Sequence, residues 1–260
     1  MMKPRHHVLV TGASRGIGRA IAEQCAVRGC RVVVHYQKNR AAAEQVLAAL
    51  PGTGHAILAA DMGNTRDVDR LWREALAAFG HIDLLVNNAG TFGDHAPLTT
   101  NFAEWERAWQ HTLATNLVGP AHLSYLAARA MAATGEMFDA AYGRGRIVNI
   151  SSRGAFRGEP RAPAYGASKA GLKSLSQSLA LALAPQGVYV YCIAPGWVDT
   201  DMAGEYLTGP RAAEIRAQHP LGRVATAEEI ARTAVFCGLD APATMTGSII
   251  DVNGASYLRT

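Results

Sequence analysis

The sequence predicts an α/β protein built on one doubly wound, parallel seven-stranded sheet with helices on both faces. Short apolar runs alternate with helical patterns from one end of the chain to the other, and this alternation is typical of a parallel sheet covered on both sides. No linker, repeat or low-complexity segment interrupts the pattern, and a length of 260 residues suits one large domain. We therefore expect residues 1–260 to form a single domain.

The apolar runs define the strands, and the segments between them carry helical spacing. The expected strands are Val8–Val10, Arg31–Tyr36, His55–Ala60, Leu84–Asn87, Arg146–Ile150, Val188–Ile193 and Ser248–Val252. The expected helices are Gly16–Arg28, Ala41–Leu50, Thr65–Phe79, Ala103–Ala133, Ala164–Ala184 and Ala227–Leu239. Sheets of this kind bind ligands beyond the carboxyl ends of their strands, so the residues that follow each strand are the candidates for a site.

Composition excludes several classes of function. Hydrophobic residues make up 49% and charged residues 18% of the chain, yet no run approaches the ~20 apolar residues of a membrane helix. The net charge is +4 and arginines are spread along the whole length, which favours an anionic small molecule over a nucleic acid. The basic N-terminus runs straight into the first strand, so we expect no signal peptide. Four cysteines without a Cys-x-x-Cys pair indicate reduced thiols in a cytoplasmic protein.

A glycine-rich turn follows the first strand and opens the first helix. Glycines let a backbone turn sharply and let a diphosphate approach the free N–H groups at a helix N-terminus. In this setting the turn predicts a nucleotide cofactor, although an ordinary tight turn has the same composition. The expected contacts are Gly12, Ser14, Arg15, Gly16, Ile17 and Gly18.

The end of the second strand indicates which nucleotide is bound. NAD-selective sites place an Asp or Glu there to bind the ribose hydroxyls, whereas this chain has Tyr36, Gln37 and Lys38, followed by Asn39 and Arg40. With no carboxylate present, Arg15 and Lys38 or Arg40 could pair with a 2′-phosphate. These cations could also be solvated surface groups. The sequence favours NADP, with NAD as the alternative.

Other polar or small residues follow the third and fourth strands. Asp61, with Met62 beside it, could accept a hydrogen bond from adenine or cap the following helix. Asn87 is expected to tie neighbouring strands together, and the small residues after it would let the backbone pass close to a ribose. The candidates in that turn are Asn88, Ala89 and Gly90. No pair of histidines has the spacing of a metalloprotease site, so we predict no metal.

Tyr165 and Lys169 head a long helical run that follows a loop rich in Gly and Pro. Residues four apart share a helix face, and a nearby ammonium would lower the pKa of the phenol toward the range used in acid–base catalysis. Ser152 follows the fifth strand and could reach the same place. Such pairs also occur by chance, so the interpretation depends on the other motifs.

Taken together, these residues resemble the short-chain dehydrogenase/reductase family, whose domain is Rossmann-like. Within it the chain is most similar to the branch of 3-oxoacyl-carrier-protein reductases and glucose dehydrogenases. The resemblance covers nearly the whole chain. It rests on Thr11–Gly18, Asp61, Asn87–Gly90, Asn116, Ser152, Tyr165, Lys169, Pro195, Gly196 and Thr200.

The resemblance implies a role for each matching residue. Tyr165 would protonate a substrate carbonyl as the nicotinamide delivers hydride, and Ser152 would polarise that carbonyl. Lys169 would hydrogen-bond the nicotinamide ribose, and Asn116 would hold a water that links Lys169 to solvent. The cofactor would also contact Pro195, Gly196, Val198 and Thr200. Relatives are often homotetramers, or homodimers, built on the helices expected at 103–133 and 164–184.

Substrate contacts are predicted from position alone. Arg153, Phe156, Trp197 and Met202 would border the pocket, with Ser152 and Tyr165 at its reactive end. Arg153 could bind an anionic substrate or form a surface ion pair. The loop at 92–97 and the long stretch at 132–145 could also border the pocket, and residues 199–220 are expected to form a mobile, lid-like helical segment.

The predicted activity is NADPH-dependent reduction of a small or medium ketone or aldehyde. The alternatives are an NAD-dependent dehydrogenase of a sugar or secondary alcohol and a catalytically idle nucleotide-binding regulator. A carrier protein as partner is weakly supported, because residues 135–139 and 185–187, where relatives place basic residues, are neutral or acidic.

Overall fold

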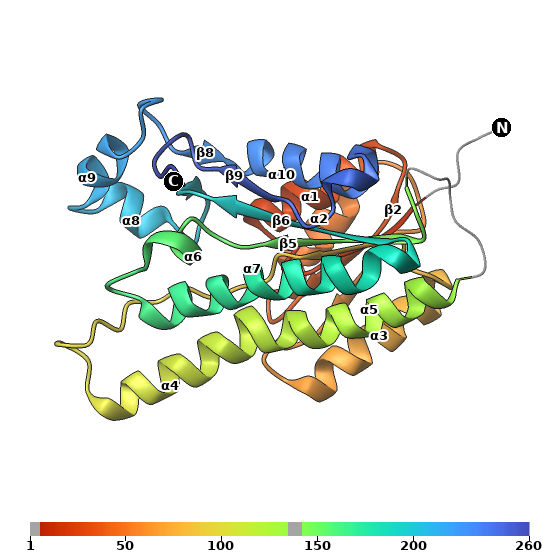
Figure 1. The fold of residues 1–260 in the computed structure, drawn as a ribbon, viewed down its shortest axis with the longest axis horizontal. Helices are drawn as coiled ribbons and strands as arrows, with labels where there is room; N and C mark the ends of the chain where they lie inside the picture. The colour runs from red at the N-terminus through yellow and green to blue at the C-terminus, as the bar shows by residue number, and fades with distance from the viewer. Residues whose placement is uncertain (1–5, 135–141, 260) are drawn as a thin grey trace.

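A computed structural model describes residues 6–134 and 142–259 of the chain (Figure 1). Seven parallel strands form one sheet in the order β3-β2-β1-β4-β5-β6-β9, which confirms the predicted fold class. The strands are β1 His7–Val10, β2 Arg31–Tyr36, β3 Ala56–Ala59, β4 Leu84–Asn87, β5 Gly145–Ile150, β6 Val188–Pro195 and β9 Ile249–Val252. The strand order reverses between β1 and β4, so a crevice for a ligand is expected at the carboxyl ends of these two strands.

Two layers of helices cover the sheet, and each encloses its own apolar core (Figure 1). One face carries α1 (Gly16–Val27), α2 (Arg40–Ala49) and α10 (Ala227–Val235). The other carries α3 (Thr65–Phe79), α5 (Gly119–Ala133) and α7 (Pro163–Leu183). Because both faces are covered, every residue of β1, β4 and β5 is buried, and these strands read as continuous rather than alternating apolar runs.

The long helix expected at 103–133 is interrupted. It consists of α4 (Phe102–Leu113), a π-helical turn (Ala114–Val118) and α5. The buried Asn116 lies in that turn, where its side chain bonds the backbone of a neighbouring loop. A single widened turn of this kind is rare within helices and often marks a functional position. A second π-helical turn, Phe236–Asp240, ends α10.

The segments that follow β5 and β6 extend past the carboxyl ends of the strands, at the left of Figure 1. They contain α6 (Gly154–Arg157), α8 (Gly204–Thr208) and α9 (Ala212–Ala217). A two-residue strand, β7 (Val198–Asp199), pairs with β8 (Ala225–Thr226). This segment has a small apolar cluster of its own, formed by Ala203, Leu207 and Ile215. Short 3-10 turns occupy Ala184–Gln186 and Ala243–Met245.

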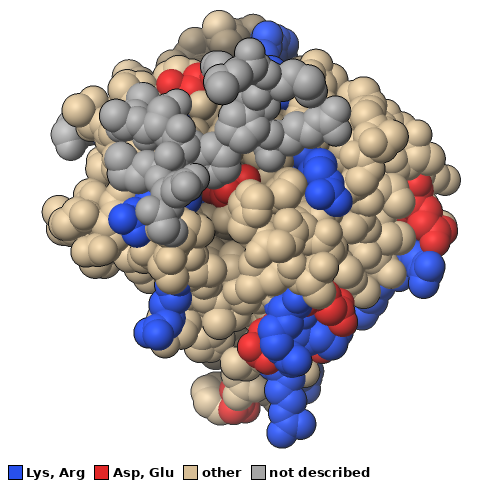
Figure 2. Space-filling view, turned by 90° about the vertical axis from the view of Figure 1, so that its right-hand side faces the viewer, with Lys and Arg blue, Asp and Glu red and all other residues tan. Residues whose placement is uncertain are grey.

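The opposite end of the molecule carries the amino ends of the strands. Figure 2 looks onto that end, where Lys and Arg side chains are interspersed with Asp and Glu along the lower edge. Within the described ranges, no helix is both long and apolar enough to cross a membrane. All four cysteines are buried and unpaired by disulfides, as the sequence predicts.

Candidate active site

A cavity of about 430 Å³ opens at the carboxyl ends of the central strands. It runs from the glycine-rich turn after β1 to the segment after β6, and most of the predicted cofactor residues line it. Those residues are Gly12, Ser14, Arg15, Gly16, Ile17, Tyr36, Gln37, Lys38, Asp61, Met62, Asn88, Ala89, Gly90, Tyr165, Lys169, Pro195, Gly196, Val198 and Thr200. Gly18 is not among the lining residues.

Gly18 allows the first helix to pack against the turn that precedes it. A Cβ at this position would lie 2.3 Å from the carbonyl oxygen of Gly12 and 2.4 Å from Nδ2 of Asn88. Gly12 itself has a φ of +64°, a region that glycine adopts without strain. Both glycines are therefore required by the backbone geometry of the turn.

Side chains from β4 and its following loop hold the same turn. The amide Nδ2 of Asn88 donates to the carbonyl of Thr11 at 2.9 Å, and the Thr11 hydroxyl accepts from the backbone N–H groups of Asn88 and Ala89. Asn87 donates to Asn149 and so joins β4 to β5, the strand-tying role expected of it. The turn is thus fixed from the neighbouring strand.

His35, in β2, contacts the glycine-rich turn, and the sequence did not indicate this contact. Its Nδ1 accepts the backbone N–H of Gly12 at 2.9 Å, so its Nε2 carries the proton and donates to the carbonyl of Ala60 at 3.0 Å. Burial lowers the pKa of His35 to about 4, which keeps the ring neutral and the acceptor available at physiological pH. His35 therefore supports the glycine-rich turn from the neighbouring strand β2.

Asp61 lines the cavity but does not cap the following helix, so that alternative is wrong. The cap of α3 is Asn64, which accepts from the N–H groups of Arg66 and Asp67. Asp61 accepts instead from the N–H of Gly63 at 2.8 Å. Two residues separate Asp61 from the true cap, Asn64, and only the course of the loop decides between them.

The cavity wall after β2 is basic. Arg15 and Lys38 both line it beside Tyr36, and neither takes part in the ion pairs found in residues 6–134 and 142–259. Arg40, by contrast, is bonded to Glu44 at 2.7 Å. The arrangement therefore offers two uncommitted cations and no carboxylate among residues 36–39, a donor set that fits a phosphate on the ribose.

The other end of the cavity brings Ser152, Tyr165 and Lys169 together. Ser152 follows β5, and the two others lie in the first two turns of α7. Lys169 Nζ donates to the carbonyl of Ile150 at 2.8 Å and stands 5.8 Å from the centre of the Tyr165 ring. The two helix residues share a face as predicted, and the strand end supplies the hydroxyl beside them.

The surrounding protein shifts the pKa values of Tyr165 and Lys169, and the shift of Tyr165 is opposite to the one predicted from the sequence. Burial raises the pKa of Tyr165 to about 12, while its hydrogen bond with Ser152 acts in the lowering direction. Burial also lowers the pKa of Lys169 to about 8. The predicted lowering of the phenol pKa by Lys169 is not found, because burial raises this pKa, the charge of Glu159 raises it further, and the group that acts against them is Ser152 rather than Lys169.

Asn116 lies behind the cavity rather than in its wall. Its Oδ1 accepts from the N–H of Thr91 at 2.8 Å, and its Nδ2 donates to the carbonyl of Thr91 and to the Ser168 hydroxyl. A Cβ on Gly90 would lie 3.3 Å from Asn116 Oδ1 and 3.5 Å from Lys169 Nζ. Asn116 and Lys169 therefore both approach the same small residue.

The predicted substrate residues separate into two groups. Arg153, Trp197 and Met202 line the cavity, together with Phe92 from the loop after β4. Phe156 does not line it: its ring stacks on Tyr257, with Arg259 over it. The single turn of α6 directs the two residues to different sides.

Arg153 is buried, with 2% of its surface exposed, so the alternative of a surface ion pair is wrong. Its Nη2 donates to Oε1 of Gln218, just after α9, at 2.9 Å. Burial lowers its pKa to about 10. The side chain therefore joins the end of β5 to the segment that covers the cavity.

Glu159 also lines the cavity and was missed by the sequence analysis, since a lone Glu in a Gly- and Pro-rich loop looks like a solvated charge. Further lining residues not predicted are His35, Asn39, Ala42, Thr115, Ile150, Ser151, Asp201 and Ala203. Residues 135–139, where a carrier-protein surface was considered, lie outside the described residues.

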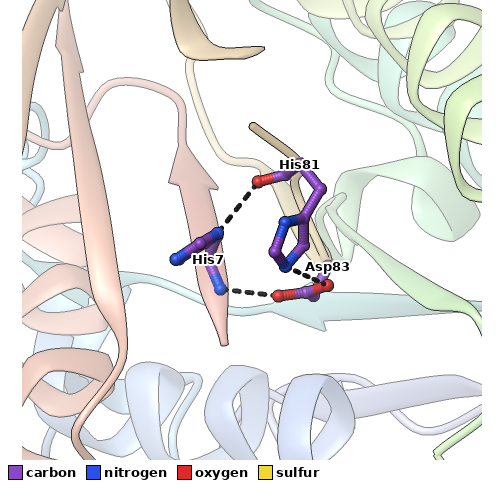
Figure 3. A group of neighbouring side chains, drawn as sticks. All are labelled: His7, His81 and Asp83. Carbon is purple, nitrogen blue, oxygen red and sulfur yellow. Dashed lines mark hydrogen bonds and ion pairs between the residues drawn. The ribbon is translucent and has the colours of Figure 1, made fainter. Parts of the chain in front are cut away.

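A second polar cluster lies at the opposite end of the sheet. Among the residues that the structure describes, His7, His81 and Asp83 bring three possible metal-ligand atoms within 4.8 Å of one another (Figure 3). The Asp83 carboxylate already accepts the backbone N–H of His7 at 2.7 Å, His7 Nδ1 contacts the carbonyl of His81 at 3.2 Å, and the two imidazoles are tilted by 45° with centroids 4.4 Å apart. Because these contacts join His7 of β1 to the residues just before β4, we interpret the cluster as a structural link between the two strands.

Comparison with known proteins identifies the family of the chain. Residues 12–255 match a protein-family model described as enoyl-(acyl carrier protein) reductase. The 3-oxoacyl-(acyl-carrier-protein) reductase FabG of Escherichia coli is 36% identical over 250 residues, which is 96% of each chain. The FabG of Staphylococcus aureus is 34% identical over 99% of this chain and 100% of its own. The reductase of Synechocystis is 36% identical over 96% of each. With the sheet, the glycine-rich turn and the Ser152, Tyr165 and Lys169 group in place, this chain belongs to the short-chain dehydrogenase/reductase family of NAD(P)-dependent oxidoreductases.

Proposed function

We propose that the protein is an NADPH-dependent reductase of small or medium ketones and aldehydes. The observation that carries the proposal is the make-up of one continuous cavity. One end has a glycine-rich turn flanked by Arg15 and Lys38, and the other has a hydroxyl, a phenol and an ammonium. The first set suits a phosphorylated dinucleotide, and the second suits proton transfer to a carbonyl oxygen.

In this proposal the dinucleotide supplies hydride, and the protein supplies the proton and the orientation. Arg15 and Lys38 would hold the 2′-phosphate, and the backbone of the glycine-rich turn would face the diphosphate. Ser152 would donate a hydrogen bond to the substrate carbonyl and fix it next to Tyr165. Polarisation of the carbonyl by these two hydroxyl groups stabilises the negative charge that develops on its oxygen.

Tyr165 suits the role of general acid. With a pKa near 12, its phenol is protonated at neutral pH and ready to donate, which is the state that carbonyl reduction requires. Lys169, whose pKa burial brings to about 8, would return a proton to the phenolate through a hydroxyl or water. Asn116 would hold that water from its position behind Gly90. A protonated phenol beside Ser152 thus suits the donation of a proton to a carbonyl oxygen.

The relatives that carry the name 3-oxoacyl-(acyl-carrier-protein) reductase make 3-oxoacyl thioesters the first substrates to test. We further propose a cytoplasmic homotetramer or homodimer. Exposed apolar side chains on α5 and α7, among them Tyr125 and Leu181 at 58% and 82% exposure, support association through these helices. Light scattering of the purified protein would give the number of subunits.

Fluorescence titration with NADPH and with NADH tests the cofactor assignment. We expect tighter binding of NADPH, and a loss of about tenfold in Arg15→Ala with little change for NADH, because a hydrogen-bonded charge contributes about 1.5–3 kcal/mol and solvent screens part of it at an exposed position. Arg19→Ala, one turn further along α1 and already paired with Glu23, is the matched control. Equal or tighter binding of NADH would contradict the assignment and point to the NAD-dependent alcohol or sugar dehydrogenase instead.

A further inference from the structure

Glu159 presents a carboxylate to the substrate end of the cavity. It lines the cavity together with Phe92, Tyr165 and Trp197, and only 17% of its side chain is exposed. Its negative charge is close enough to Tyr165 to act on the titration of the phenol. The proposed reduction does not use this half-buried carboxylate, whose ion pair is with Arg157 at the end of α6.

The fold makes room for Glu159. A Cβ on Gly154 would lie 2.7 Å from its Oε1, and a Cβ on Gly166 would lie 3.3 Å from its backbone nitrogen. Gly154 begins α6 and Gly166 lies in the first turn of α7, so both helices leave space where they pass the glutamate. The position of the carboxylate is therefore set by packing and not by a freely rotating side chain.

The carboxylate keeps capacity to accept hydrogen bonds. Its nearest cation, Nε of Arg157, stands 3.8 Å from Oε1, which is longer than a hydrogen bond. The Nη2 of Arg153, the other neighbouring cation on this loop, donates its hydrogen bond to Gln218. Since a carboxylate has about four acceptor positions, a donor on the substrate would find open ones.

The charges around Glu159 limit which kind of substrate group can be the donor. Arg157, Arg153 and Arg211 all act on the carboxylate, and their attraction opposes the effect of burial. A substrate ammonium would meet these three positive charges, and a substrate carboxylate would meet Glu159 itself at low dielectric. A neutral hydroxyl avoids both penalties.

Three aromatic rings, Phe92, Tyr165 and Trp197, line this end of the cavity, and Tyr206 packs against two of them. Phe92 contacts Tyr165 edge-on at 4.9 Å between ring centroids and Tyr206 at 5.5 Å, and Tyr206 lies 5.4 Å from Trp197. Such rings pack against the C–H surfaces of a substrate and contribute no hydrogen-bond acceptor comparable to a carboxylate. Glu159 and Asp201 are the carboxylates among the lining residues that follow β5 and β6, and Glu159 is the one whose charge acts on Tyr165.

We propose that Glu159 selects carbonyl substrates that carry a neutral hydroxyl group, which donates a hydrogen bond to its carboxylate. This inference rests on the proposed carbonyl reductase activity and names the class of its substrate. A site built to pair with a hydroxyl discriminates strongly against the analogue that lacks it, because the buried acceptor is then left without a donor.

Matched pairs of ketones that differ in one hydroxyl against one methyl group test the proposal. Suitable pairs are hydroxyacetone with butanone, 4-hydroxy-2-butanone with 2-pentanone, and 5-hydroxy-2-pentanone with 2-hexanone. For at least one pair we expect the wild type to favour the hydroxylated member by about tenfold or more in kcat/KM. Glu159→Met should bring that ratio close to one, and Glu159→Gln, which keeps an oxygen acceptor, should lie between.

Control measurements separate selectivity from folding. The exposed Glu228→Gln, in the first turn of α10, should leave the ratio unchanged, and NADPH affinity should be the same in every variant. An equal rate on both members of every pair in the wild type, or an unchanged ratio in Glu159→Met, would overturn the inference while leaving the reductase activity intact. Higher kcat/KM for acetoacetate or for an amino ketone than for the hydroxy ketones would overturn it as well. If the wild type binds NADPH but reduces no ketone or aldehyde, the proposed function itself fails.

Discussion

His35 offers a sharp test of how the cofactor turn is held. Replacing it with Leu removes the acceptor for the Gly12 N–H and the donor to the Ala60 carbonyl. Each buried backbone group left without a partner costs about 1–3 kcal/mol, so the free energy of unfolding should fall by about 2–6 kcal/mol in all. Because Gly12 belongs to the turn that faces the diphosphate, NADPH affinity should also fall by tenfold or more.

His55 is a matched control for this substitution. Its ring also bridges two backbone groups, accepting from Val32 N–H at 3.1 Å and contacting the Pro51 carbonyl at 3.0 Å, but it is partly exposed and distant from the cavity wall. His55→Leu should reduce stability slightly and leave NADPH binding unchanged. His35→Asn keeps an acceptor for Gly12, so it should lose stability but retain most of the affinity.

Thermal unfolding measures the stability of each variant, and fluorescence titration well below its melting temperature measures the affinity for NADPH. If folded His35→Leu binds NADPH as tightly as the wild type, the bracing role is wrong, whatever the loss of stability.

Two further predictions concern the proposed general acid and the opposite end of the sheet. Tyr165→Phe should lower kcat by about 10²–10⁴-fold with an unchanged NADPH dissociation constant, and a smaller loss in the rate of NADPH oxidation would argue against Tyr165 as the acid. Asp83, whose pKa burial raises to about 6, should make the wild type more stable relative to Asp83→Asn as the pH falls from 7 toward 4. Because the raised pKa means that the folded protein binds this proton more tightly than the unfolded chain does, protonation at low pH increases the free energy of unfolding, by roughly 3 kcal/mol for this shift. His6, His7 and His81 lie beside Asp83 and are present in both proteins. Melting curves across that range would contradict the assignment if the difference stayed constant.

Much of the fold could be predicted because its signals are local. A strand buried on both faces needs a continuous apolar run, and each of the seven expected strands is present at its predicted place. The glycines of the first turn and the i, i+4 spacing of Tyr165 and Lys169 act over a few residues, so they too can be recognised in sequence. The prediction for α4 and α5 was less accurate, because the π-helical turn depends on a bond from Asn116 to a loop 25 residues away.

The site depended more on distant contacts. Arg153 and Phe156 belong to the same short segment, yet one is buried against Gln218 and the other stacks on Tyr257 near the end of the chain. The sequence of the segment does not show which of the two is buried, because their partners belong to elements more than 60 residues later in the chain. Glu159 is similar, because its burial depends on the space left by two glycines in neighbouring helices.

The sequence by itself determined the layered α/β architecture, the position of the cofactor turn and the grouping of Ser152, Tyr165 and Lys169 at strand and helix ends. It could do so because periodicity, turn chemistry and helix spacing are properties of short stretches. Only the tertiary structure decided which side chains brace the turn, as His35 does, and which face the substrate, as Glu159 does. Those roles depend on burial and on hydrogen-bond partners far away in the chain, and burial also decided the protonation of Tyr165 and Lys169.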